Sequence, residues 1–271
     1  MKDLIIVRGG GDLATGTIYK LYKCGFPILI LEVSMPSAIR RNVAFSEAVY
    51  QGMHTVEDVT CYRAESIAEA ESLLQEGKLV VLVDPKGDSI SQLKPVAVVD
   101  AILAKKNLGT HKAMAPITVA LGPGFTAGED VDAVIETKRG HNLGRVLWQG
   151  SAIPNTGIPG IIGGYGKERV IHSPAEGILR NVCKITDTVK KGEEIAVVET
   201  ANGNVSVVAS LDGLLRGLIR DGYPVTKGFK IADIDPRTEE YQNCFTISDK
   251  ARCIAGGVVE AILQRKGEIG L

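Results

Sequence analysis

The feature that most constrains the fold of this chain is an internal duplication, in which residues 173–199 align without a gap with residues 209–235 at an offset of 36. The eight identical positions are Gly177/Gly213, Leu179/Leu215, Arg180/Arg216, Val189/Val225, Lys191/Lys227, Gly192/Gly228, Ile195/Ile231 and Ala196/Ala232. Each copy contains only short strand and turn patterns and is too small to bury a core alone. The two copies are therefore expected to pack together as one compact all-β sandwich with pseudo-twofold symmetry.

The duplicated segment resembles the biotinyl/lipoyl carrier fold, in which a hairpin presents the lysine that is modified. Here Asn202 stands where that lysine would fall, and Gly203 follows it. Asn-Gly is a strong hairpin turn, so the hairpin is expected to form without the attachment nucleophile. We predict a barrel-sandwich module over residues 169–236 that is structural or serves in docking and is not a swinging arm.

The N-terminal segment predicts a strand, a glycine-rich turn, a helix and a second strand. An apolar run at residues 4–7 precedes the glycines, and a second apolar run ends at Glu32. Gly9, Gly11 and Ala14 have the G-x-G-x-x-G/A spacing of dinucleotide-binding turns, and Glu32 stands where the partner of a ribose hydroxyl would be. This pattern predicts an α/β, Rossmann-like unit with a parallel sheet.

In this interpretation, the free N–H groups at the helix N-terminus bind a phosphate group. The candidate contacts are Gly9, Gly10, Gly11, Asp12, Thr15 and Glu32. The alternative is a tight strand-to-helix turn that binds no nucleotide. Arg40 and Arg41, which follow Glu32, are two further candidates for pairing with an anionic ligand, and an exposed basic pair without a ligand is the competing interpretation.

Two aspartates follow later apolar runs. Asp84 ends the run at 79–83, and Asp100 ends the run at 96–99. Ligands bind open parallel sheets beyond the carboxyl ends of the strands, so both carboxylates are candidates for the same edge as the first glycine-rich turn. Capping of a turn or a helix is the interpretation that we favour for each aspartate.

The segment from Leu121 to Gly150 mixes glycines with Arg, His, Asn, Thr and acidic residues, a pattern poorly suited to a packed core. It predicts two glycine-rich loops, each after a strand. The candidate binding residues are Gly122, Gly124, Phe125 and Thr126 in the first loop, and Arg139, His141, Asn142 and Arg145 in the second. Backbone N–H groups and arginines suit phosphate, and Glu136 is expected to orient one of the arginines.

Five segments together resemble a known group, the YqeB family of accessory proteins of selenium-dependent molybdenum hydroxylases, which is distantly similar to the XdhC-type xanthine dehydrogenase maturation factors. The segments are RGGGDLATG (Arg8–Gly16), RRNVAFSEAV (Arg40–Val49), GPGFTAGEDVDAVIET (Gly122–Thr137), RGHNLGRV (Arg139–Val146) and NTGIPG (Asn155–Gly160). The resemblance implies a maturation protein that binds the molybdenum cofactor, as molybdopterin or its cytosine dinucleotide. It also implies a molybdenum hydroxylase apoenzyme and other cofactor-maturation proteins as partners.

Two other functions compete with this one. An enzyme would be an NAD(P)-dependent oxidoreductase with His141 as its proton donor, or a sulfur or selenium transferase with a reactive cysteine. None of the five cysteines lies in the glycine-rich loops, which counts against the transferase. A structural adaptor is the third candidate, and it leaves the ligand-like loops without a role. Whether the protein is an enzyme therefore stays open.

Composition narrows the class of protein. The net charge of −1 gives no general attraction to nucleic acid or to anionic membranes. No apolar run approaches the ~20 residues of a membrane span. The cysteines form no C-x-x-C pair and are odd in number, which fits a reducing, cytoplasmic compartment. The four histidines are scattered, so no metal site is expected, and homo-oligomerisation stays open.

The predicted domains are residues 1–168, the duplicated module at 169–236, and a closing segment at 237–271. Ser248 is expected to cap a helix from about Asp249 to Gln264, whose apolar stripe packs back on the N-terminal unit. Cys253 is expected to lie in the core beside that stripe.

Overall fold

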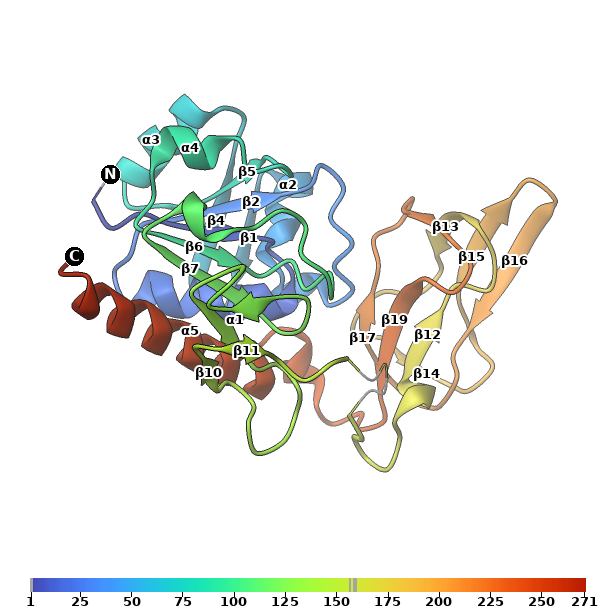
Figure 1. Ribbon diagram of the computed structural model, residues 1–271. Helices are drawn as coiled ribbons and strands as arrows, with labels where there is room; N and C mark the ends of the chain where they lie inside the picture. Colours follow the sequence, from blue (N-terminus) through green and yellow to red (C-terminus); the bar gives the residue numbers. More distant parts are fainter. Residues whose placement is uncertain (1, 156, 158–159) are drawn as a thin grey trace. The chain divides into compact units, whose positions relative to one another are not determined.

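The computed structural model describes residues 2–155, 157 and 160–271, and the chain divides into two compact units. Unit 1 lies within residues 1–36, 44–156 and 247–271, and unit 2 within residues 37–43 and 157–246. Figure 1 gives the order of the elements in each unit. The NTGIPG segment falls partly outside the described residues, and so do any contacts of its residues 156, 158 and 159. Among the described residues, every helix is too short or too polar to span a bilayer.

A single large sheet is the framework of unit 1. Nine strands of the described residues form it, in the order β10-β9-β7-β6-β1-β2-β5-β4-β3. Their bounds are β1 (Ile5–Arg8), β2 (Ile28–Glu32), β3 (Met53–Val56), β4 (Val59–Ala64), β5 (Leu79–Val83), β6 (Ala97–Asp100), β7 (Ile117–Leu121), β9 (Ala133–Ile135) and β10 (Val146–Leu147). The central strands are short, almost uninterrupted apolar runs because both faces of the sheet are covered.

The prediction of a parallel, Rossmann-like sheet is wrong, because the sheet is mixed. The seven strands from β9 to β4 pair in parallel, whereas β3 and β10 run antiparallel at the two edges, as far as the structure describes the chain. β3 turns directly into β4 through Glu57, which has a φ of 55°, and so short a connection can join only antiparallel strands. The sheet also draws β7, β9 and β10 from the central glycine-rich segment.

Helices cover both faces of the sheet of unit 1. The helices are α1 (Asp12–Lys23), α2 (Ala48–Gln51), α3 (Ile67–Gln75), α4 (Ser89–Leu93) and α5 (Asp249–Glu268), with short 3-10 turns η2 (Phe45–Glu47) and η3 (Lys112–Met114). Figure 1 shows α1 and α5 on one side and α3 and α4 on the other. Successive side chains of a strand point to opposite faces of the sheet, and Ile6 and Leu29 pack with Leu74 of α3 on the face that α3 and α4 cover. A separate pair, β8 (Thr126–Ala127) and β11 (Gly150–Ser151), lies beyond the sheet.

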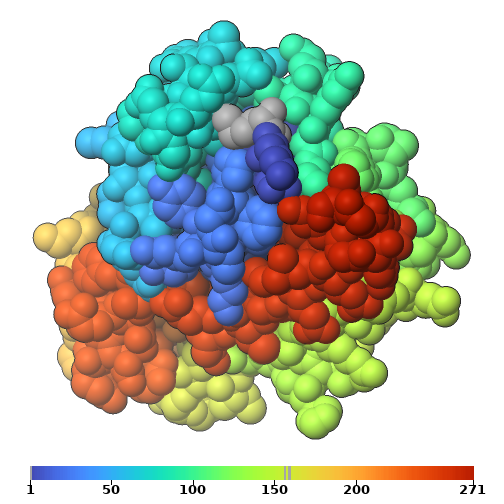
Figure 2. All heavy atoms as spheres, turned by 90° about the vertical axis from the view of Figure 1, so that its left-hand side faces the viewer, coloured from blue at the N-terminus to red at the C-terminus, as the bar shows by residue number. Residues whose placement is uncertain are grey.

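The C-terminal helix α5 packs along α1, and Figure 2 shows it against the N-terminal segment. The predicted cap is confirmed, since Ser248 Oγ accepts a hydrogen bond from the Ala251 N–H at 3.2 Å. A β-carbon on Gly16 of α1 would lie 2.8 Å from the backbone of Ala251, so the two helices meet where α1 has no side chain. At its other end, Lys266 Nζ pairs with Asp3 at 2.6 Å.

Unit 2 is built from the two duplicated segments. Its described strands form two four-stranded antiparallel sheets, β12-β19-β17-β14 and β16-β15-β13-β18. The bounds are β12 (Val170–His172), β13 (Gly177–Asn181), β14 (Thr188–Val189), β15 (Glu194–Thr200), β16 (Gly203–Val208), β17 (Gly213–Leu218), β18 (Pro224–Val225) and β19 (Lys230–Asp235), with η1 (Arg41–Val43), η4 (Lys167–Arg169) and η5 (Tyr241–Cys244). β13 of the first copy pairs with β18 of the second, and β17 of the second pairs with β14 of the first.

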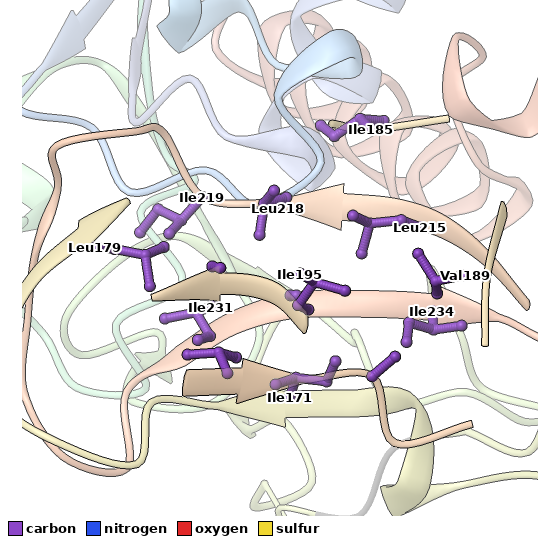
Figure 3. Close-up of a cluster of buried hydrophobic side chains, with 14 of the residues drawn as sticks. Ile171, Leu179, Ile185, Val189, Ile195, Leu215, Leu218, Ile219, Ile231 and Ile234 are labelled. Carbon is purple, nitrogen blue, oxygen red and sulfur yellow. The ribbon is translucent and has the colours of Figure 1, made fainter. Parts of the chain in front are cut away.

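This exchange of strands explains why the copies fold together. Each sheet contains strands of both copies, and the inward side chains of both sheets form one buried cluster, including Leu179, Ile195, Leu215 and Ile231 (Figure 3). None of these four side chains is exposed to solvent. Neither copy can bury this surface without the other.

The prediction of a biotinyl/lipoyl-type module is corrected. Unit 2 is a pair of four-stranded antiparallel sheets, and this strand pattern by itself is no evidence of a biotinyl or lipoyl carrier. The hairpin of β15 and β16 turns at Ala201-Asn202, and Gly203 has a φ of 113°. The predicted hairpin forms, but the predicted Asn202-Gly203 turn is shifted by one residue, since Gly203 is the first residue of β16 and pairs with Thr200.

An ionic network lies against the core of unit 2. Asp235, which has no exposed surface, accepts hydrogen bonds from Arg216 Nη1 at 3.2 Å and from Arg237 Nη2 at 2.9 Å. Asp233 pairs with Arg169 Nη2 at 3.0 Å and with Arg216 Nη2. The guanidinium and backbone groups of Arg237 hold the pKa of the Asp235 carboxyl below its usual value, although burial acts in the other direction. The network pairs two buried aspartates with three arginines, of which Arg169 and Arg216 are also largely buried.

Candidate functional site

The candidate site lies at the carboxyl ends of the parallel strands of unit 1. β1 pairs with β2 on one side and with β6 on the other. The chain after β1 continues to β2, whereas β6 begins the other half of the sheet, so the strand order reverses between β1 and β6. In open α/β sheets this switch point is where ligands bind. The loops after β1, β6, β7 and β9 all begin at this edge.

The predicted glycine-rich turn after β1 is largely occupied by protein. Gly9 has a φ of 94°, and a β-carbon there would lie 2.9 Å from the carbonyl oxygen of Ala101. Gly10 packs against the backbone of Ser46, where a β-carbon would lie 3.0 Å from the nitrogen. These two glycines therefore serve close backbone approach. Gly11 differs, because it has a φ of −66° and a β-carbon there would meet nothing within 4 Å.

Glu32 and Thr15 bond the turn itself. Glu32 accepts the Gly10 N–H on Oε2 at 2.7 Å and the Val33 N–H on Oε1 at 2.8 Å. Burial raises the pKa of Glu32 above its usual value, and the two N–H groups oppose this rise. The buried hydroxyl of Thr15 accepts the Phe45 N–H at 3.0 Å. Both side chains stabilise the loop, so Gly11, at the start of α1, is the glycine of the motif that faces open space.

A buried polar network lies under this turn, at the switch point. Arg8 Nη1 donates to Thr110 Oγ1 at 2.5 Å, and the same hydroxyl donates to Asp100 Oδ2 at 2.6 Å. Arg8 Nη2 also donates to the carbonyl of Pro85 at 3.2 Å. All three polar side chains are at most 2% exposed. Arg8 therefore connects the loops that follow β1, β5 and β6. Sequence reasoning missed its role and that of Thr110, which follows Asp100 by ten residues.

The favoured interpretation of the two aspartates is confirmed. Asp84 accepts the N–H groups of Gly87 and Ser89 at 3.0 and 2.9 Å, and so caps the turn into α4. Asp100 accepts the Ile102 N–H at 3.2 Å in addition to the Thr110 hydroxyl. Burial raises the pKa of Asp100 above its usual value. Burial also acts to raise the pKa of Asp84, but the hydrogen bonds that Asp84 accepts, led by that from Ser89, outweigh this effect and lower its pKa.

The first central loop, after β7, is mostly structural. A β-carbon on Gly122 would lie 2.6 Å from Thr137 Oγ1, and one on Gly124 would lie 2.6 Å from the backbone nitrogen of Lys106. Phe125 is buried in a small apolar cluster. Thr126 donates its N–H to Asp130 Oδ2 at 2.8 Å, and its hydroxyl lies 3.3 Å from Ser151 Oγ.

The second central loop, after β9, meets the start of α5. Arg139 makes a bidentate pair with Asp249, at 2.8 and 3.0 Å, which raises the pKa of Arg139. His141, Asn142 and Arg145 are exposed on this loop. Glu136 does not orient an arginine as predicted, because its carboxylate accepts the N–H groups of two backbone residues, Lys138 at 2.7 Å and Ile153 at 2.8 Å.

Two side chains of α5 at this edge were not predicted for it. Burial lowers the pKa of Lys250, and the guanidinium of Arg139 lowers it further. The carboxylates of Asp12 and Glu136 act on Lys250 in the opposite direction. Lys250 therefore lies among groups that follow β1 and β9. The sequence carries a signal for it, since a lysine in the first turn of a helix opposes the helix dipole.

Cys253 is the second side chain of α5 that was not predicted for this edge. It is exposed, and its thiol donates to the carbonyl of Leu143 at 3.2 Å, so its prediction as a core residue is wrong. A β-carbon on Gly144 would lie 2.7 Å from the Cys253 carbonyl oxygen.

The structure therefore brings together some of the predicted residues and separates others. The groups at the edge of unit 1 are Gly11, Asp12, Arg139, His141, Asn142 and Arg145, with Lys250 added. Arg40 and Arg41 belong to unit 2, where Arg40 donates to the carbonyl of Asn243 at 2.8 Å and Arg41 to that of Leu218 at 2.8 Å. No group of three or more His, Cys, Asp or Glu side chains suited to a metal ion occurs within the described part of the chain.

Comparison with known proteins gives one similar sequence of unknown role. No family model matches the chain. The Uncharacterized protein YqeB of Escherichia coli (strain K12) is 52% identical over 261 residues, which cover 96% of this chain and 47% of that protein. The chain thus spans about half the length of this relative.

Solved structures are similar only at a low level. The product-bound ectoine utilization protein EutE (DoeB) from Ruegeria pomeroyi has 12% identity and a TM-score of 0.24, over 86% of this chain and 57% of that chain. An aspartoacylase family protein from Mesorhizobium loti has 13% identity and a TM-score of 0.30, over 85% and 84% of the two chains. A succinylglutamate desuccinylase/aspartoacylase from Rhodobacter sphaeroides has 11% identity and a TM-score of 0.27, over 86% and 84%. At these scores the likenesses support no argument about activity.

These findings correct the functional prediction. The predicted role in maturing a selenium-dependent molybdenum hydroxylase is corrected, since the similar sequence is described as uncharacterized and none of the proteins found is described as a maturation factor of such an enzyme. Nothing among these proteins is described as an XdhC-type factor. The alternative oxidoreductase and transferase roles fall with it. The motifs that carried the prediction are explained in large part by close backbone packing, as at Gly9, Gly10 and Gly124.

Proposed function

We propose that unit 1 binds a small molecule with an anionic group, of the phosphate type, at the carboxyl edge of its sheet between the start of α1 and the start of α5. The observation that carries the proposal is the position of Lys250 among Asp12, Glu136 and Arg139, which belong to three different segments. Two cations, Lys250 and Arg139, lie here with the carboxylates of Asp12, Glu136 and Asp249, and an anionic group would give the half-buried ammonium of Lys250 a further favourable contact.

The start of α1 supports the proposal independently of Lys250. Its N-cap residue, Gly11, makes no side-chain cap, so no N-cap side chain competes with a ligand at the start of the helix. The absence of a side chain there is not required by packing, since a β-carbon would meet nothing within 4 Å. The open space is therefore consistent with a bound group that approaches the backbone, as phosphates do at helix N-termini.

The charges at this edge support an anion over a cation. The acidic side chains that end the strands are held by N–H groups of their own loops, as described for Glu32, Asp84 and Glu136. The basic side chains of the second central loop, Lys138 and Arg145, extend toward solvent. Arg139 is already paired with Asp249, so the cations that a negatively charged ligand would meet are the exposed Lys138 and Arg145 and the half-buried Lys250.

Calorimetric titration with inorganic phosphate, AMP, CTP and NAD tests the proposal. The variant Gly11→Val fills the open space without strain, because the φ of −66° suits any residue, and it is expected to abolish binding. Lys250→Met is expected to weaken binding by about tenfold or more, the value of a charge-assisted contact.

Matched controls separate these effects from general damage. Gly267→Val adds the same side chain to a glycine with nothing within 4 Å, seventeen residues along α5 from Lys250. Lys227→Met removes an exposed lysine of unit 2. Both controls should bind as the wild type does. If no anion binds the wild type, or if Gly11→Val and Lys250→Met bind as tightly as the wild type, the proposal is wrong.

A further inference from the structure

The loop that joins β6 to β7 is fixed at both ends by the buried network at the switch point. Asp100, at the end of β6, and Thr110, ten residues later, are linked through the Thr110 hydroxyl, and Arg8 donates to the same hydroxyl. Asn107 closes the loop internally, since its side chain accepts the Thr110 N–H at 2.9 Å and donates to the Thr110 carbonyl at 2.8 Å. Residues 101–109 therefore form a closed loop whose two ends are held by the buried side chains of Arg8, Asp100 and Thr110.

The backbone of this loop is strained in its middle. Leu103 has a φ of 59° and Lys105 a φ of 62°, values that L-residues other than Asn and Asp seldom adopt. Each such residue costs of the order of 1 kcal/mol and persists only when surrounding contacts impose it. Here the surrounding contacts are the network of Arg8 and the two glycines that the loop touches. The shape of the loop is thus imposed and not intrinsic.

The loop lies between the two glycine-rich turns of the candidate site. Ala101 is the residue that a β-carbon on Gly9 would strike, and Lys106 is the one that a β-carbon on Gly124 would strike. The loop follows β6, which with β7 lies between β1, the strand that leads to Asp12, and β9, the strand that leads to Arg139. Lys105 and Lys106 are both exposed there.

We propose that Lys105 and Lys106 form a second cationic subsite at the same edge, and that the ligand of unit 1 therefore carries two separate anionic groups. In this arrangement one group binds between Gly11 and Lys250, and the other binds at the tip of the loop. β6, which the loop follows, is hydrogen-bonded directly to β1, which leads to Gly11, so the two subsites follow neighbouring strands and suit two phosphates carried by one small molecule. Arg8 and Thr110 act as positioning residues for the loop. The inference rests on the proposed function.

The test compares inorganic phosphate, which has one anionic group, with inorganic pyrophosphate and fructose 1,6-bisphosphate, which have two. The wild type is expected to bind at least one of the two-group probes about tenfold more tightly than phosphate, or better. The double variant Lys105→Ala/Lys106→Ala should lose this preference and keep the affinity for phosphate. Both lysines are exposed, so the double variant should fold as the wild type does.

The positioning role has its own readout. Thr110→Val removes the hydroxyl that joins Arg8 to Asp100, and it should reduce the preference as the double variant does. Thr110→Ser restores the hydroxyl and should restore the preference, which a purely steric role of the residue would not predict. The inference is overturned if the wild type does not prefer two-group probes to phosphate, or if that preference survives in the double variant. In either case, phosphate binding that depends on Lys250 still supports the proposed function. Absence of binding by every probe overturns both.

Discussion

The three glycines inside α5 give a sharp test of how this helix is docked. A β-carbon on Gly257 would overlap the carbonyl oxygen of Gly144 and would lie 3.1 Å from Ile135 Cγ2. On Gly256 it would only reach Lys20 Nζ at 4.0 Å, and on Gly267 it would meet nothing within 4 Å. Alanine would therefore overlap its neighbours at Gly257, just reach a side chain at Gly256 and contact nothing at Gly267, all within one helix.

The magnitudes follow from two opposing effects. Replacing glycine by alanine inside a helix ordinarily stabilises it by roughly 0.5–1 kcal/mol. Gly267→Ala should therefore raise the free energy of unfolding by about that amount, and Gly256→Ala should not lower it. Overpacking costs about 1–3 kcal/mol, so Gly257→Ala should be less stable than Gly267→Ala by about 2 kcal/mol or more.

Urea unfolding followed by tryptophan fluorescence measures these differences. The single tryptophan, Trp148, lies in unit 1, as α5 does, so its signal follows the correct unit. In thermal unfolding the same comparison should separate the midpoints by several degrees, at about 2–4 °C per kcal/mol. Equal stabilities of Gly257→Ala and Gly267→Ala would refute the docking of α5 on the second central loop.

Three further predictions concern charge and capping. Asp235→Ala should lower the stability of unit 2 by about 3–5 kcal/mol by leaving buried arginines unpaired, whereas Asp212→Ala, at an exposed pair, should change it little. Hydrogen exchange of peptides from β17 and β19 distinguishes the two variants. Burial raises the pKa of Glu32 in the folded state, so its contribution to stability is full below the unfolded-state pKa and declines as pH rises through the folded-state pKa. Glu32→Gln should therefore flatten the pH dependence of the free energy of unfolding in urea above about pH 4.5. The exposed control Glu260→Gln should leave that pH dependence as in the wild type. Ser248→Ala should cost about 1 kcal/mol in urea unfolding, and Ser248→Asp should restore most of it; an unchanged midpoint in Ser248→Ala would contradict the cap.

The local elements were largely readable from the sequence. The helix after Ser248 forms as predicted, and it extends to Glu268, four residues beyond the expected end. The first helix ends at Lys23, and Gly25 just beyond it has a positive φ. Asp84 caps the turn that follows β5. Each of these features depends on hydrogen bonds between residues a few positions apart, so propensity and spacing are sufficient to predict it.

The glycines show where such reasoning ends. Gly9 and Gly124 fit the pattern of a phosphate-binding loop, but they are required because the backbones of Ala101 and Lys106 approach them. A glycine that admits a ligand and a glycine that admits another strand of the protein have the same local sequence. Gly11 is distinguished from them only by the empty space around it, which no motif contains.

The sequence by itself determined the strands and helices, the duplication and the turn at Asn202, because these depend on periodicity and on neighbours in the chain. Tertiary structure alone decided which groups meet at the candidate site. Lys250 lies beside Arg139 although 111 positions separate the two residues, because α5 returns to pack against the loop after β9. Such contacts are set by the complementary shapes of Gly144, Cys253 and Gly257, which act only once the sheet and its helices are assembled.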